Sequence, residues 1–168
     1  RKGVDLLFKA FAACDNKSLR LVLVGDGKEK DNLMNLAGQL GISDRVEFRG
    51  FLSGQALREC YKTAGAFVLP TREDCFGLVL IEAMCAGLPI IVSQYSDGAA
   101  ETVTEDVNGY IVDPYDTAQF TQAIDRTFTD EQTRKRLGTA GCEATEKFRF
   151  ENVAAGYLEA IEDALSRR

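Results

Sequence analysis

The sequence predicts an α/β domain built on a doubly wound parallel sheet. Short apolar runs rich in β-branched residues alternate with longer segments in which apolar residues recur at helical spacing. The runs are too apolar to leave one strand face in water, which is typical of a parallel sheet covered by helices on both sides. The 168 residues, 45% of them hydrophobic, suit a single domain over residues 1–168.

Helices and strands are expected in alternation through the first two thirds of the chain. Apolar spacing marks the helices, and glycine or proline marks many of the ends. We expect helices over residues 4–14, 28–40, 57–64 and 76–86, with Ser53 as the cap of the third. We expect strands over residues 19–24, 46–49, 66–69, 90–92 and 110–112.

The last third of the chain is expected to be helical. Asp116 and Gln119 can form a capping box at the start of a first helix, and a second helix covers about residues 131–144. A third helix starts at Phe150. Its apolar face carries Val153, Tyr157, Ile161 and Leu165.

Composition excludes several classes of function. A net charge of −6, with no basic cluster longer than residues 134–136, argues against a nucleic-acid partner. The chain has no histidine, which excludes Ser-His-Asp and Cys-His catalysis and the usual histidine metal sites within it; we expect no metal. Five cysteines without a C-x-x-C pair suit reduced thiols in the cytosol. No signal peptide is visible, and the abrupt start at Arg1 suggests a fragment of a longer polypeptide.

Ligands of doubly wound sheets bind at the carboxyl ends of the strands. The loops at Gly25, at Leu52, over residues 70–75 and over residues 93–100 should therefore line the site. Gly25 opens a Gly-Asp-Gly turn that lacks the third glycine of a dinucleotide fingerprint, since Lys30 stands there. We interpret it as a tight turn close to the nucleotide.

The most informative segment is PTREDCFGLVLIEAM, in which Asp74 and Glu82 bracket seven residues. If Phe76 opens a helix, the free backbone amides of Phe76, Gly77 and Leu78 point out of its N-terminus, where phosphate binds readily. Gly77 would let the backbone approach a ligand closely. Residues 76–81 could instead form a buried strand, although the glycine and proline that follow favour the helix.

Glu82 is expected to be buried, because its helix is apolar nearly all round. A buried carboxylate needs a polar partner, and a sugar diol would provide two hydrogen bonds. Eight helical steps would place Asp74 and Glu82 ~12 Å apart, beyond the roughly 5–9.5 Å of a glycosidase acid pair. That span favours a nucleotide sugar. The alternative is a structural ion pair between Glu82 and a lysine or arginine.

These motifs together resemble the C-terminal domain of family 4 retaining glycosyltransferases, which have the two-domain GT-B fold with Rossmann-like halves. The resemblance runs end to end. It rests on RKGVDLL, LVLVGDG, RVEFRGFL, AGAFVLPTREDCFGLVLIEAMCAGLPIIVS and NGYIVDP. The acid-bracketed segment is the most specific of these motifs.

The resemblance implies a role for each site residue. Asp74 would lie by the donor sugar as the catalytic candidate, and Glu82 would bind the ribose hydroxyls. The amides of residues 76–78 would hold the diphosphate, Lys2 would neutralise the phosphates, and Leu52 would lie near the base. The family more often has Glu at the first acidic position. Here Glu73 stands beside Asp74, so either could serve.

The resemblance also implies transfer of a hexose from a UDP- or GDP-sugar to an acceptor hydroxyl, with retention and without a metal. The expected setting is the synthesis of bacterial cell-surface polysaccharide or glycolipid. The acceptor site, a catalytic histidine and a phosphate-binding arginine would belong to an upstream N-terminal domain, onto which the final helix would cross. We expect a cytoplasmic enzyme and leave its attachment to the inner face of the membrane open. The alternatives are half of a nucleotide-sugar epimerase and a non-catalytic nucleotide-binding module.

Overall fold

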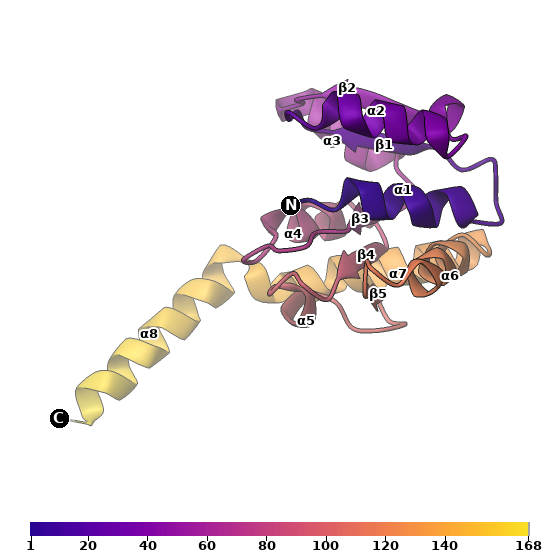
Figure 1. The fold of residues 1–168 in the computed structure, drawn as a ribbon. Coiled ribbons are helices and arrows are strands. Elements are labelled where there is room, and N and C mark those ends of the chain that lie inside the picture. The colour runs from indigo at the N-terminus through magenta and orange to yellow at the C-terminus, as the bar shows by residue number, and fades with distance from the viewer. Residues whose placement is uncertain (168) are drawn as a thin grey trace.

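Helices and strands alternate through the first two thirds of the chain in the computed structural model, which describes residues 1–167 (Figure 1). The strands are β1 (Leu21–Val24), β2 (Val46–Gly50), β3 (Phe67–Leu69), β4 (Ile90–Ser93) and β5 (Gly109–Val112). The α-helices are α1 (Val4–Ala13), α2 (Lys30–Gln39), α3 (Gly54–Thr63), α4 (Leu78–Cys85), α5 (Ala99–Thr102), α6 (Thr117–Thr127), α7 (Glu131–Ala144) and α8 (Phe150–Ser166). Short 3₁₀ helices cover Ser43–Arg45 (η1) and Thr145–Phe148 (η2).

The pairings between these strands are all parallel, which confirms the predicted fold class. The ladder is, however, interrupted where a continuous sheet was expected. β1 pairs with β2, and β3, β4 and β5 form a second sheet in chain order. Within residues 1–167, no ladder joins β1 to β3. An apolar run predicts a strand but not its hydrogen-bonding neighbour, so the break between β1 and β3 could not be predicted from local pattern.

Helix α1 packs against both sheets and lies between them in Figure 1. Phe8 and Phe11 belong to a core cluster that includes side chains of β1, β2 and α2. Leu7 and Ala10, on another side of the helix, belong to the cluster around Ile91 of β4. Because apolar burial stabilises by roughly 25 cal/mol per Å², α1 gives the two sheets a shared core in place of a shared ladder.

The element boundaries agree with the prediction to within three residues, although the caps differ in detail. Ser53 occupies the N-cap of α3 but makes no capping hydrogen bond, and the helix starts at Gly54. Asp116 caps α6 by accepting a hydrogen bond from the Gln119 backbone amide at 3.0 Å. The Gln119 side chain accepts instead from the backbone amide of Asp113 at 2.7 Å, so only half of the predicted capping box forms. The four-residue α5 was not predicted.

Helix α8 projects away from the rest of the molecule and buries none of its described side chains (Figure 1). The apolar face expected from its spacing is present but faces solvent; Tyr157, for example, is 70% exposed. Across residues 1–167, every helix falls short of the length and apolar character that a membrane span requires.

The five cysteines form no disulfide, as expected. Cys14 is buried in the core, and this burial raises the pKa of its thiol to about 12. Cys75 and Cys85 are exposed.

Gly138 provides a test of the packing between α7 and the end of α4. A Cβ at Gly138 would lie 2.0 Å from the carbonyl oxygen of Gly87, a backbone atom that cannot move aside cheaply. Gly138→Ala should therefore destabilise the protein by about 2 kcal/mol in urea unfolding, although alanine is the better helix former.

Gly156→Ala in α8 is the matched control, because a Cβ there would meet nothing within 4 Å. It should leave stability unchanged or raise it by up to about 1 kcal/mol. The same sign for both substitutions would contradict the packing described here.

Candidate functional site

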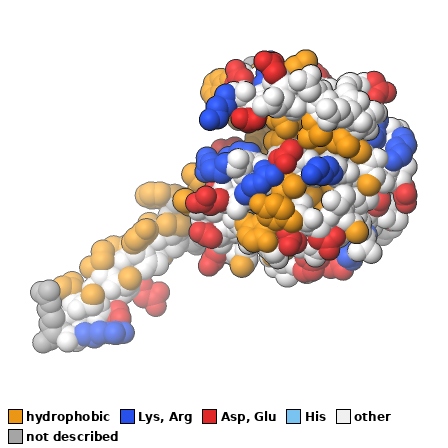
Figure 2. Space-filling model, in the orientation of Figure 1, with side chains coloured by type: hydrophobic (Ala, Val, Ile, Leu, Met, Phe, Trp, Pro, Cys, Tyr) orange, Lys and Arg blue, Asp and Glu red, His pale blue; other side chains and the backbone are white. Residues whose placement is uncertain are grey.

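The loops that the sequence predicts to line the site follow the carboxyl ends of β1, β2, β3 and β4. Gly25 follows β1, and its amide donates a hydrogen bond to the carbonyl of Gly50, the last residue of β2, at 2.7 Å. Leu52 comes two residues later and is half-buried. Figure 2 shows the surface hollowed between the part that carries α2 and α3 and the part that carries α1 and α4, with charged side chains around the hollow.

The loops that follow β3 and β4 are locked together by their backbones. The Asp74 amide donates to the Tyr95 carbonyl at 3.3 Å, and the Asp97 amide donates to the Asp74 carbonyl at 3.0 Å. A Cβ at Gly98 would lie 1.9 Å from the carbonyl oxygen of Phe76, so only glycine permits this approach. The backbone at Asp74 is therefore held in place by the loop that follows β4.

Lys2 and Asp74 form an ion pair between residues 72 positions apart, through Lys2 Nζ and Asp74 Oδ2. The Arg1 carbonyl, beside Lys2, accepts a hydrogen bond from the Arg72 amide at 2.9 Å, which anchors the start of the chain on the loop after β3. The hydrogen bond from Lys2 holds the pKa of Asp74 below its ordinary value, and the Phe76 backbone amide contributes in the same direction.

Asp74, and not Glu73, is the acid that faces Lys2. Glu73 is exposed, and its backbone is held by the Thr71 hydroxyl, which donates to the Glu73 carbonyl at 2.6 Å. The Asp74 side chain is 14% exposed and carries the contact with Lys2. Lys2 therefore pairs with Asp74 and not with Glu73.

Helix α4 starts at Leu78, two residues later than predicted, because Gly77 adopts a left-handed conformation with φ 76°. Gly77 is also buried: a Cβ there would lie 3.1 Å from Leu69 and 3.3 Å from Leu80. Backbone conformation and packing therefore explain this glycine without the close ligand approach that we expected. The late start also removes the premise of the ~12 Å estimate, eight helical steps between the acids, since only the four steps from Leu78 to Glu82 are helical, about 6 Å of rise.

Glu82 is exposed, which corrects the expectation that it would be buried. Helix α4 packs only one side on the second sheet, where Leu80 and Met84 are fully buried. Leu78, on the outer side, is 69% exposed. Among residues 1–167, the hydrogen-bond partner of the Glu82 carboxylate is the Tyr61 hydroxyl, which donates to Oε2 at 3.0 Å. The alternative of a structural ion pair with a lysine or arginine is therefore wrong.

Phe76 has a packing role that its position in the motif did not suggest. Its ring is half-buried and meets Phe148 of η2 edge-on, with ring centroids 6.2 Å apart.

Tyr61 is the residue that sequence reasoning missed. It lies on α3, far from Glu82 in sequence, and nothing in its local pattern linked it to the acid.

A surface groove lies elsewhere on the molecule, away from these residues. A groove of about 860 Å³ runs between the end of α1 and α6, and it includes none of Lys2, Asp74 and Glu82. The candidate site is an open surface, so its assignment rests on the chemistry of its side chains and not on enclosure. Within residues 1–167, no group of three or more cysteine, aspartate or glutamate side chains is arranged to hold a metal ion.

Residues 1–144 match the family of glycosyl transferases group 1. The chain belongs to this family. Among its curated relatives, the lipopolysaccharide core biosynthesis glycosyltransferase LpsE of Rhizobium meliloti is 33% identical over 162 residues. That alignment covers 96% of this chain and 46% of LpsE, so the chain spans less than half of this relative.

Solved structures share the whole arrangement of the chain. Sucrose-phosphate synthase from Thermosynechococcus elongatus superposes with a TM-score of 0.84 at 30% identity, over 100% of this chain and 43% of the synthase. HepE of Anabaena, in complex with UDP, has a TM-score of 0.84 at 25% identity, over 96% of this chain and 45% of HepE. The expected C-terminal domain of a glycosyltransferase with the GT-B fold is therefore confirmed.

The ion pair at the site can be tested by titration. Lys2→Gln should raise the pKa of Asp74 toward its ordinary value, because the hydrogen bond from Lys2 is the largest cause of its lowering. The paired carboxylate contributes stability above the ordinary aspartate pKa, and this contribution is lost as the pH falls through the lower pKa of the folded protein. NMR titration of the Asp74 carboxyl carbon between about pH 2 and pH 7 measures the shift.

The control is Lys135→Gln, which removes an exposed pair with Glu131 on α7 and should leave Asp74 unchanged. If Asp74 titrates identically in the wild type and in Lys2→Gln, the pair with Lys2 does not form in solution.

Proposed function

We propose that this chain is the donor-binding domain of a family 4 retaining glycosyltransferase, which transfers a hexose from a UDP- or GDP-sugar to an acceptor hydroxyl. The observation that carries the proposal is the ion pair of Lys2 with Asp74. Asp74 lies four residues before Leu78, the first residue of α4, and α4 carries Glu82. A cation, a helix N-terminus and two carboxylates match the phosphates and the hydroxyl-rich ends of a nucleotide sugar.

The chemical task of such a site is to stabilise the diphosphate as it leaves the sugar. Lys2 supplies a full positive charge, and the N-terminus of α4 supplies about half of one. Both are fixed before the ligand arrives, which is the condition under which electrostatic stabilisation is most effective. We assign no metal to this step.

The two acids would act at opposite ends of the ligand. Asp74 would lie against the donor sugar. Its carboxyl group stays ionised because Lys2 lowers its pKa. Glu82, exposed on α4, would accept hydrogen bonds from the ribose hydroxyls. Leu52 and Gly25, at the ends of β2 and β1, would lie near the base. The amides of Phe76, Gly77 and Leu78 would face the diphosphate.

The relatives support the class of substrate and the cellular setting. HepE was solved with UDP, which supports a nucleoside diphosphate as the common part of the donor. LpsE belongs to lipopolysaccharide core biosynthesis, which supports a cell-surface glycan or lipid as acceptor. We place the acceptor site and the catalytic histidine in an N-terminal domain of the same polypeptide, and the enzyme in the cytoplasm. The presence of Lys2, Asp74 and Glu82 together argues against a non-catalytic module.

Calorimetry with UDP and with GDP tests the donor site. The 168-residue chain should bind one or both nucleotides weakly and show no transfer by itself, because the acceptor site is assigned to another domain. Lys2→Gln and Glu82→Gln should each weaken binding about tenfold or more, since each removes a charged partner of the ligand.

Glu59→Gln is the matched control, an exposed glutamate on α3 whose partner is Lys62. It should bind as the wild type does. Absence of heat with both UDP and GDP would contradict the donor site. Sugar transfer by this chain alone would contradict the assignment of the acceptor site to another domain.

A further inference from the structure

Tyr61 and Glu82 connect two helices across the candidate site. Tyr61 lies in the last turn of α3, and its hydroxyl donates a hydrogen bond to Glu82 Oε2 at 3.0 Å. The Tyr61 ring is half-buried against Phe67 of β3, with ring centroids 6.0 Å apart. Because the ring is held by packing and the hydroxyl points to Glu82, the tyrosine presents its donor to the acid from a fixed position.

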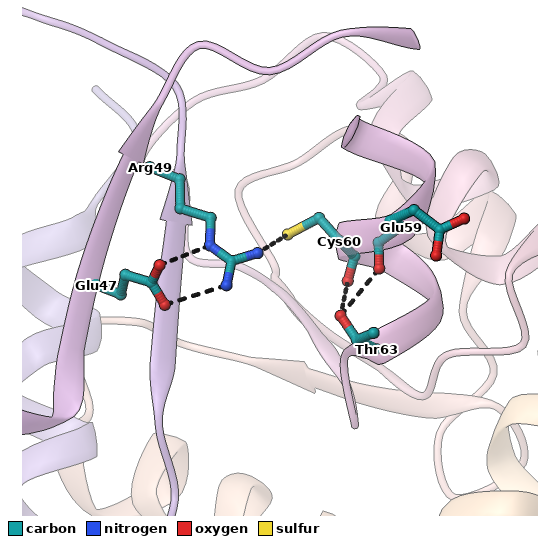
Figure 3. Close-up of polar contacts among 5 residues, drawn as sticks. All are labelled: Glu47, Arg49, Glu59, Cys60 and Thr63. Atoms are coloured by element: carbon teal, nitrogen blue, oxygen red, sulfur yellow. Dashed lines mark hydrogen bonds and ion pairs between the residues drawn. The ribbon is translucent and has the colours of Figure 1, made fainter. Parts of the chain in front are cut away.

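The helix that carries Tyr61 is itself tied to β2 (Figure 3). Arg49 on β2 makes two hydrogen bonds to Glu47, at 2.8 and 3.2 Å, and its third nitrogen lies 3.9 Å from the sulfur of Cys60. Cys60 immediately precedes Tyr61 on α3. Arg49 therefore gives α3 a side-chain contact from the β1–β2 side of the molecule, next to Tyr61.

The chemistry of this contact leaves Glu82 able to bind a ligand. Burial raises the pKa of the Tyr61 hydroxyl, and the hydrogen bond to Glu82 raises it further, so the phenol stays neutral and acts as a donor. A neutral donor orients the Glu82 carboxylate and leaves its negative charge in place. An arginine or lysine in the same position would cancel that charge. Within residues 1–167, the second oxygen of Glu82, Oε1, accepts no hydrogen bond from the protein.

We propose that Tyr61 is a positioning residue, which holds the Glu82 carboxylate in the orientation that accepts hydrogen bonds from the vicinal hydroxyls of a ribose. The proposal rests on the donor-binding function assigned above. An exposed glutamate loses rotamer freedom when it binds a ligand. Tyr61 restricts that freedom before binding, so less entropy is lost when the ribose arrives.

Tyr61→Phe separates this role from packing, because it removes the hydroxyl and keeps the ring on Phe67. Calorimetry would compare the nucleoside diphosphate that the wild-type chain binds, UDP or GDP, with its 2′,3′-dideoxy analogue. Tyr61→Phe should weaken binding of the ribonucleotide by about 3- to 20-fold. It should not change binding of the dideoxy analogue, which has no ribose hydroxyls for Glu82 to bind.

Three further variants complete the experiment. Tyr157→Phe, on the projecting helix α8, is the matched control and should bind both ligands as the wild type does. Glu82→Gln, and the double variant with Tyr61→Phe, test the dependence: once Glu82 is replaced, loss of the Tyr61 hydroxyl should have no further effect.

The outcomes separate this proposal from the function on which it rests. If Glu82→Gln weakens ribonucleotide binding and Tyr61→Phe does not, Tyr61 has no positioning role and the donor site stands. If Tyr61→Phe binds the ribonucleotide more tightly, the hydroxyl competes with the ligand and the proposal is overturned. An equal loss for both nucleotides would reveal a general structural effect and would also overturn it. If Glu82→Gln binds as the wild type does, the assigned role of Glu82 and the proposal fall together.

Discussion

The packing of α1 on both sheets is the constraint on which the candidate site depends. The β1–β2 pair and the β3–β4–β5 sheet share no ladder within residues 1–167, and α1 contributes buried side chains to the core of each. Lys2 stands just before this helix. The same packing that joins the sheets therefore places Lys2 beside the loop after β3, where Asp74 lies. The position of the Lys2 charge at the site therefore depends on the core packing of α1.

Close backbone packing gives the site its rigidity. The left-handed Gly77 ends the loop that precedes α4, and the loop after β4 lies so close that only Gly98 fits against Phe76. Asp74 lies between these contacts. A site that must stabilise charge on a leaving diphosphate benefits from such rigidity, because groups fixed in advance do not have to reorganise during the reaction.

Helix α4 packs one face in the core and exposes the other to solvent. Leu80 and Met84 complete the core beneath the second sheet, whereas Leu78 and Glu82 face outward. An exposed Glu82 can be reached by a ligand without the large desolvation cost of a buried carboxylate. The contact from Tyr61 then provides the orientation that burial would otherwise have imposed.

The sequence by itself determined the order and type of nearly all elements, the parallel pairing and the acid-bracketed segment, because periodicity and turn residues record local burial and backbone conformation. Resemblance added Lys2 to the site, although not its pairing with Asp74. The tertiary structure alone decided that Glu82 is exposed, that Tyr61 meets it and that the ladder breaks between β1 and β3. Local pattern failed there because an apolar segment is buried only on the sides that other elements cover, and contacts between distant residues leave no periodic trace.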